Sequence, residues 1–208
     1  MSAEIGRRER RKQATSAAIL DVAILLMQQR GIDGVTMEEI AAAADVAKAT
    51  LYAYFPSKEA LIAGWVRLEG RRHDVGMPEL LRANPTTRAR LHALFTYTSR
   101  WQEQHRPLME RYILHRLGAV AQGRPTGGRC QEGSGFGEHL TVVLSAGLEL
   151  GDLRADVPVA LLTRALESQY LYVLLYWLAA DGQVDLAQAC AAMVDLFLDG
   201  AAARGDRS

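Results

Sequence analysis

The chain has 208 residues, of which 49% are apolar and 23% are charged, and its formal net charge is zero. This length allows one or two domains with a substantial core, and the composition is ordinary for a soluble globular protein. Two cysteines are too few for a disulfide scaffold, and the most apolar run, residues 170–180, is shorter than the roughly 18 residues that cross a bilayer. We therefore expect a cytoplasmic protein without a membrane-spanning segment.

Positive charge is concentrated ahead of the first predicted helix. Residues 7–12 carry five positive charges and one negative charge. Such an arm can follow a phosphate backbone or enter a minor groove, although charge alone fits a solvated, disordered tail equally well. The helix that follows is predicted over residues 14–30, where apolar side chains recur at spacings of three and four, and Gly31 is placed to cap its end.

The segment 36–58 predicts two short helices joined by a tight turn and followed by the start of another helix. Thr36 and Glu39 have the spacing of a capping box, so the first of these helices begins at Thr36. Leu51 and Phe55 lie four residues apart and share the inward face of the second helix. The other faces carry Lys, Thr and Tyr side chains, which can contact phosphates and base edges in a major groove. Two crossed helices of this kind form a helix-turn-helix.

The motif in this segment is specific. The run T-x-x-x-I-A-x-x-A-x-V-x-x-x-T-L-Y-x-Y-F-x-S-K-E-x-L, from Thr36 to Leu61, resembles the DNA-binding segment of the tetracycline-repressor (TetR) family of bacterial transcriptional regulators. Three positions depart from that family: Asp45 replaces a usual glycine in the turn, Ala47 a usual serine at the helix start, and Ala49 a frequent glycine. Aspartate tolerates the left-handed backbone conformation, so we expect these changes to affect the base preference more than the fold.

The resemblance implies double-stranded DNA as a partner. In this interpretation Ala49 faces the bases, while Tyr52 and Lys58 anchor phosphates. Helix packing is the alternative for the two tyrosines, and a solvated side chain is the alternative for Lys58. The expected DNA contacts are Thr36, Lys48, Ala49, Thr50, Tyr52, Tyr54 and Lys58.

Helical periodicity continues to the end of the chain and no strand pattern appears, which predicts an all-α fold of about nine helices. With the resemblance, this gives an N-terminal three-helix helix-turn-helix DNA-binding domain over residues 1–60, including the basic arm. A helical ligand-binding and dimerisation domain is expected over residues 61–208. The glycine-rich segment 123–137 is predicted to be a mobile connection, because the G-K-[ST] of a phosphate-binding loop and a preceding strand are both missing. The tail from Arg204 is expected to be disordered.

The resemblance also implies a small-molecule effector, of unknown identity, that binds in the second domain. Candidates for its pocket are large side chains with apolar bodies and a few polar tips on neighbouring helices, although each of them can equally be an ordinary core residue. These residues are Tyr97, Trp101, His105, Met109, Tyr112, Tyr170 and Trp177.

The helix expected over residues 157–180 is apolar on nearly every side, so it must be buried on nearly every side. A terminal hairpin of two helices cannot achieve this alone, and we expect a second copy of the chain to cover it. A monomer that buries these helices internally is the alternative. Members of the TetR family dimerise through their last two long helices, which agrees with a homodimer. The expected interface residues are Leu161, Ala165, Leu171, Leu174, Val194 and Leu198.

Together with these observations, the resemblance implies a ligand-responsive repressor that binds a palindromic operator as a homodimer and is released by a small molecule. An enzyme is not expected, because no H-E-x-x-H, C-x-x-C or G-x-S-x-G motif occurs, and we assign no catalytic residue, metal site or cofactor. One alternative is a metal-sensing regulator that uses His105, His115 and Cys130. The other is a helical dimer without specific DNA binding.

Overall fold

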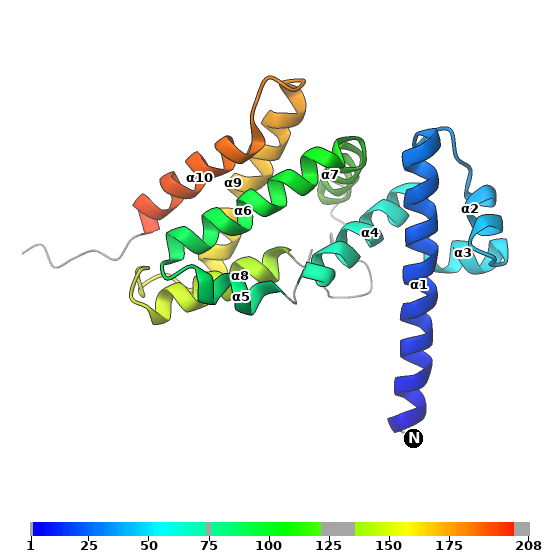
Figure 1. Cartoon of the computed structure of the whole chain (residues 1–208), viewed down its shortest axis with the longest axis horizontal. Helices are drawn as coiled ribbons and strands as arrows, with labels where there is room; N and C mark the ends of the chain where they lie inside the picture. Colours follow the sequence, from blue (N-terminus) through cyan, green and yellow to red (C-terminus); the bar gives the residue numbers. More distant parts are fainter. Residues whose placement is uncertain (1, 74–75, 122–135, 202–208) are drawn as a thin grey trace, which may run out of the picture. The chain divides into compact units, whose positions relative to one another are not determined.

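The computed structural model describes residues 2–73, 76–121 and 136–201 (Figure 1). These residues form ten α-helices and no strand, which confirms the all-α fold class. The helices are α1 (Ser2–Arg30), α2 (Met37–Ala43), α3 (Lys48–Tyr54), α4 (Lys58–His73), α5 (Met77–Ala83), α6 (Thr87–Gln104), α7 (Arg106–Ala121), α8 (Phe136–Glu149), α9 (Val159–Ala179) and α10 (Leu186–Ala201).

Two expectations about the helices need correction. The described residues contain ten helices rather than about nine, because the short α5, which has a proline in its first turn, has too few residues to show a clear periodicity. Helix α1 begins at Ser2 rather than near residue 14, so the basic residues are part of the helix and do not form a disordered tail. Most residues added at this end are Ala, Arg, Glu, Lys and Gln, which favour helix strongly. At 1.5 Å per residue, the 29 residues of α1 span about 44 Å.

The chain divides into two compact units, Met1–Glu69 with Leu114–Arg124 and Gly70–Ile113 with Pro125–Ser208. In the first unit α1 packs against α2, and α2 packs against α3. Its core contains the inward face of α1, represented by Ile19 and Ala23, together with Ile40 and Leu51 from the next two helices. A close contact lies at Gly64 in α4, where an added Cβ atom would be 2.8 Å from Phe55 Cε1.

In the second unit, α6 packs against α8 and α10, and α9 packs against the same two helices (Figure 1). Helix α9 begins directly after Pro158, as the sequence predicts. Helix α10 is capped by Asp185, whose carboxylate accepts a 2.9 Å hydrogen bond from the Gln188 amide. Gly151 has a φ of 75° just after α8, a left-handed conformation that suits a helix C-terminus.

Among the described residues, no helix has the length and hydropathy needed to cross a membrane. Two predictions from the sequence concern residues that the structure does not describe. These are the mobile connection, of which residues 123–135 lie outside the described residues, and the tail from Arg204.

Candidate nucleic-acid interface

The helix-turn-helix begins with the predicted capping box. The backbone N–H of Thr36 donates to Glu39 Oε2 at 2.8 Å, and the Glu39 amide donates to Thr36 Oγ1 at 3.2 Å. Arg30 adds a 2.7 Å ion pair to the other carboxylate oxygen. These hydrogen bonds, from the Thr36 amide first and then from Arg30, lower the pKa of Glu39 to about 2. The start of α2 is therefore held by its own side chains and by the last residue of α1.

The turn between α2 and α3 accommodates two of the three departures from the family pattern, Asp45 and Ala47. Asp45 has a φ of 51°, the left-handed region that the usual glycine would occupy, and aspartate is among the residues that adopt it most easily. Ala47 is the N-cap of α3 and makes no side-chain hydrogen bond there. The missing cap costs about 1 kcal/mol relative to serine, while the turn itself is closed by a 3.0 Å bond from Val46 N to Ala41 O.

Helix α3 has a buried back and an accessible front. Leu51 is fully buried and Phe55, at the C-cap, is nearly so, which fixes the orientation of the helix against the core of the first unit. Lys48 and Ala49 are exposed, Tyr52 is 39% exposed, and Thr50 and Tyr54 are half-buried. Five of the seven predicted DNA contacts thus come from one short helix. Three of these five are exposed: the two at its N-terminal end and Tyr52.

The other two predicted contacts have roles in the protein itself. The Thr36 hydroxyl donates its hydrogen to Glu39 Oε2 at 2.9 Å, so the capping box already uses its donor. The Lys58 ammonium donates to the carbonyl oxygens of Ile32 and Val35, at 2.8 and 3.1 Å. An ammonium has three donors, and two of them here join the start of α4 to the loop between α1 and α2. Contacts of Thr36 and Lys58 with DNA stay predictions.

We expect Lys58→Ala to destabilise the first unit by about 1–3 kcal/mol, because two partly buried carbonyl groups lose a charged donor. Thermal unfolding measures this loss. If Lys58 also holds a phosphate, binding to all DNA sequences weakens alike and the salt dependence becomes shallower. Binding must be measured well below the melting temperature, and an altered sequence preference alone would contradict a phosphate contact.

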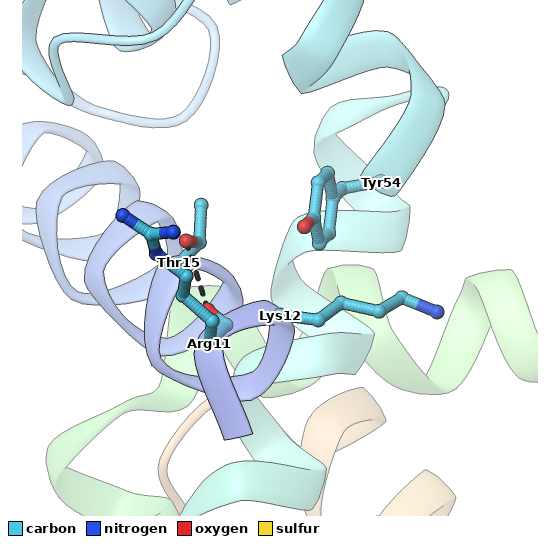
Figure 2. A pocket seen from close by; sticks show the side chains of 4 residues that line it. All are labelled: Arg11, Lys12, Thr15 and Tyr54. Atoms are coloured by element: carbon cyan, nitrogen blue, oxygen red, sulfur yellow. Dashed lines mark hydrogen bonds between the residues drawn. The ribbon is translucent and has the colours of Figure 1, made fainter. Parts of the chain in front are cut away.

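A surface hollow of about 350 Å³ lies between α1 and the C-terminal end of α3 (Figure 2). It is lined by Arg11, Lys12, Thr15 and Tyr54. Thr15 Oγ1 donates to the Arg11 carbonyl oxygen at 3.0 Å, while Arg11 and Lys12 are exposed. A guanidinium, an ammonium and a phenol hydroxyl together match the groups that bind backbone phosphates. The basic run in the sequence pointed to this charge but could not show that it borders the recognition helix.

The sequence of this chain is similar to known proteins in the helix-turn-helix segment and beyond it. The sequence model of the family described as "Bacterial regulatory proteins, tetR family" matches residues 19–64. The transcriptional repressor KstR2 of Rhodococcus jostii is 28% identical over 193 residues, which are 92% of this chain and 93% of that protein. Residues 19–64 are therefore a DNA-binding segment of the TetR family.

Two solved structures share the fold of this chain. Thermus thermophilus FadR, a TetR-family repressor in complex with lauroyl-CoA, has a TM-score of 0.74 at 24% identity, covering 93% of this chain and 98% of its own. Bacillus subtilis FadR, in complex with stearoyl-CoA, has a TM-score of 0.63 at 19% identity, covering 88% and 98%. Proteins of this family are transcriptional regulators and not enzymes, so this chain is a DNA-binding regulator.

The residues predicted for an effector pocket of this regulator all lie in the second unit, but they do not share one environment. Tyr97 is 50% exposed, whereas Trp101 and His105 are half-buried and lie against each other with ring centroids 4.7 Å apart. The buried members are Met109, Tyr112, Tyr170 and Trp177.

Tyr170 is the centre of a buried cluster that the sequence did not reveal. Its hydroxyl donates to Gln102 Oε1 at 2.8 Å, and its ring centroid lies 4.9 Å from those of both Phe95 and Phe136. Burial raises the pKa of the Tyr170 hydroxyl well above its ordinary value, so it stays protonated and donates. Phe95 and Gln102 both lie on α6, and only the arrangement of α6, α8 and α9 in the folded unit brings Phe136 and Tyr170 next to them.

The residues predicted for a dimer interface fall into two groups. Leu161, Ala165 and Leu171 are exposed on α9. The chain itself accounts for the burial of the other three, which are Leu174, Val194 and Leu198. Further large apolar side chains are exposed on the same two helices, namely Tyr172, Tyr176 and Leu196.

A metal-sensing role has little support in the described part of the chain. Those residues contain no group of three His, Cys, Asp or Glu side chains that could hold a metal ion. Cys130, which that alternative needs, lies outside the described residues. Cys190 is buried, and burial raises the pKa of its thiol to about 11, so it is a poor metal ligand at neutral pH.

Proposed function

We propose that this chain is a repressor that binds a palindromic operator as a homodimer and leaves it when a small molecule binds. Residues 1–60 are the DNA-binding domain in this proposal, and residues 61–208 hold the effector and form the dimer. The observation that carries the proposal is the α3 surface, where buried Leu51 and Phe55 hold Lys48, Ala49 and Tyr52 in an accessible position. A repressor of this kind acts in the cytoplasm, on DNA.

The proposed DNA contacts divide into base-reading and phosphate-binding groups. Ala49 and Thr50, near the start of α3, suit approach to base edges, because a short side chain lets the backbone come close to a thymine methyl. Tyr52, Tyr54 and Lys58 supply donors for phosphates, and the hollow beside Tyr54 adds Arg11 and Lys12. Phosphate contacts position the protein on the duplex, and base contacts select the sequence.

The proposed dimer uses the exposed apolar face of α9 and α10. Leu161, Tyr172 and Leu196 are 60%, 71% and 75% exposed in one chain, which is unusual for side chains of this size on neighbouring helices. A second copy would remove this face from water. Two identical reading heads related by a two-fold axis then require a site with two equal half-sites.

The proposed effector class is a long-chain acyl-CoA. Support comes from the two FadR structures, whose ligands are lauroyl-CoA and stearoyl-CoA and whose fold the chain shares. The second unit also offers the chemistry that such a ligand needs, because its interior combines aromatic rings with a few polar side chains, among them the hydrogen-bonded Tyr170 and Gln102. A small set of polar groups in an apolar surrounding is typical of ligand sites.

Selection from a pool of random duplexes at moderate salt tests the DNA-binding part. We expect enrichment of a pseudo-palindrome with two equal half-sites. If the retained duplexes show no common sequence, the proposed function is wrong and the chain binds DNA by charge alone.

Fluorescence anisotropy on the selected duplex tests the effector. Lauroyl-CoA and stearoyl-CoA should release the protein from DNA, whereas free coenzyme A and the free fatty acids serve as matched controls. Release by no acyl-CoA, with specific DNA binding intact, would assign the effector to another class of molecule.

A further inference from the structure

The helix-turn-helix of this protein is acidic, which is unexpected for a surface that meets DNA. Residues 37–54 contain three acidic side chains, Glu38, Glu39 and Asp45, and one basic side chain, Lys48. Glu39 is used by the capping box and Asp45 lies in the turn. Glu38 lies in the first turn of α2, where a carboxylate is favourable, and its side chain also reaches Lys48 of α3, so this pair bears on what the surface binds.

Glu38 forms an ion pair with Lys48 across the gap between α2 and α3. Their side chains are 51% and 62% exposed, and the Lys48 ammonium lies 5.9 Å from the centre of the Tyr52 ring. The hydrogen bond from Lys48 is the main reason that the pKa of Glu38 is lowered. A hydrogen bond from the Glu38 backbone is the next cause, and a hydrogen bond from Tyr52 contributes least. The same ion pair raises the pKa of Lys48. Lys48 and Tyr52, which are both proposed to contact DNA, thus both interact with the carboxylate of Glu38, which is not among the proposed DNA contacts.

An exposed ion pair of this kind contributes little to stability. The ion pair instead changes the charge of the α2–α3 surface, because the Glu38 carboxylate neutralises Lys48, the only positive charge of these two helices. A lysine whose charge is neutralised by a carboxylate displaces few counterions from a phosphate backbone. Counterion release is what drives binding to DNA of any sequence. A carboxylate near the groove also disfavours phosphates, while it can accept a hydrogen bond from a cytosine amino group.

We propose that Glu38 is a specificity-determining residue that acts through Lys48. Its carboxylate holds the ammonium at the α2–α3 surface and keeps it from backbone phosphates, so unselected DNA gains little from Lys48. Removing that charge frees the lysine for phosphates of any duplex, so binding to unselected DNA strengthens more than binding to the operator and discrimination between them falls. This inference rests on the proposed function, since it concerns the same DNA-binding surface.

Glu38→Gln tests the proposal without changing the size of the side chain. Anisotropy titrations use the selected duplex and a scrambled duplex of equal length and composition, at several salt concentrations between about 50 and 200 mM. We expect affinity for the scrambled duplex to rise about 3–10-fold and the slope of log K against log salt to steepen by about 0.9, the value of one extra phosphate contact. The ratio of specific to nonspecific affinity should fall. Glu103→Gln, an exposed acid on α6, changes the net charge equally and should alter neither slope nor ratio.

A double-mutant cycle with Lys48→Met decides whether Glu38 acts through the lysine. In the Lys48→Met background, Glu38→Gln should leave the slope and the nonspecific affinity unchanged. An equal increase in both backgrounds would mean that the carboxylate repels phosphates by itself, and it would overturn the positioning role.

Failure of the inference and failure of the proposed function can be told apart. Wild-type protein that selects a site, together with a Glu38→Gln variant of unchanged slope and discrimination, overturns only the inference. Wild-type protein with no sequence preference overturns the proposed function and the inference with it.

Discussion

Phe55→Ala is expected to lower the free energy of unfolding of the first unit by about 3–5 kcal/mol, the usual cost of truncating a buried phenylalanine. Phe55 is the C-cap of α3, is 7% exposed, and packs against Gly64 of α4. Its loss removes the anchor that holds the recognition helix against the core. Native-state amide hydrogen exchange in α3 and α4 measures the change, and affinity for DNA should fall with it.

Gly64→Ala supplies the control through a double-mutant cycle. A Cβ atom at Gly64 would lie 2.8 Å from Phe55 Cε1 and 3.1 Å from Leu20 Cδ2, so this change alone should destabilise by about 1–3 kcal/mol although alanine favours helix. In the Phe55→Ala background the new methyl group meets a cavity instead of a ring. The two changes together should therefore cost clearly less than their sum. Additive costs would show that Phe55 and Gly64 do not pack as described.

The double variant Leu161→Glu, Leu196→Glu is expected to be a folded monomer. Both side chains are exposed in one chain, so the new charges stay in water there but would be buried and unpaired in a dimer. Sedimentation should show half of the wild-type mass. Operator affinity should fall by roughly 100-fold or more, because two linked half-sites bind about 10²–10⁴ times more tightly than one.

Leu150→Glu is the matched control, since Leu150 is also exposed and apolar but lies just beyond α8. It should leave the mass and the operator affinity unchanged. A double variant that keeps the wild-type mass would place the dimer contact on another surface. Leu174 is a poor choice for this test, because it is buried within its own chain and a charge there would unfold the second unit.

The helix-turn-helix could be predicted closely because its signals are local. The capping box at Thr36, the four-residue spacing of Leu51 and Phe55, and the tolerance of Asp45 for a positive φ each depend on neighbours in sequence. Ser57 likewise caps α4 by accepting a 3.3 Å hydrogen bond from the Ala60 amide. Such features are determined by a few consecutive residues, so they do not depend on how the rest of the chain packs.

Other features depend on how the elements pack, and the sequence could not supply them. The apolar residues of α9 predict that the helix is covered on both sides, but they do not show which side its own chain covers. The sequence therefore cannot separate Leu174, which is buried within the chain, from the exposed Leu161. Lys58 reaches carbonyl groups 26 and 23 residues away. The pairing of Glu38 with Lys48 needs the crossing of two helices, which the spacing of ten residues does not reveal.

Hydroxyl-radical footprinting of the wild-type protein on its selected duplex tests the central claim most directly. The account predicts two protected regions of equal extent, related by a two-fold axis and centred about one helical turn, or 10–10.5 base pairs, apart or a multiple of it. A single protected region without symmetry, or uniform protection along the duplex, would contradict a dimeric regulator that reads DNA through α3.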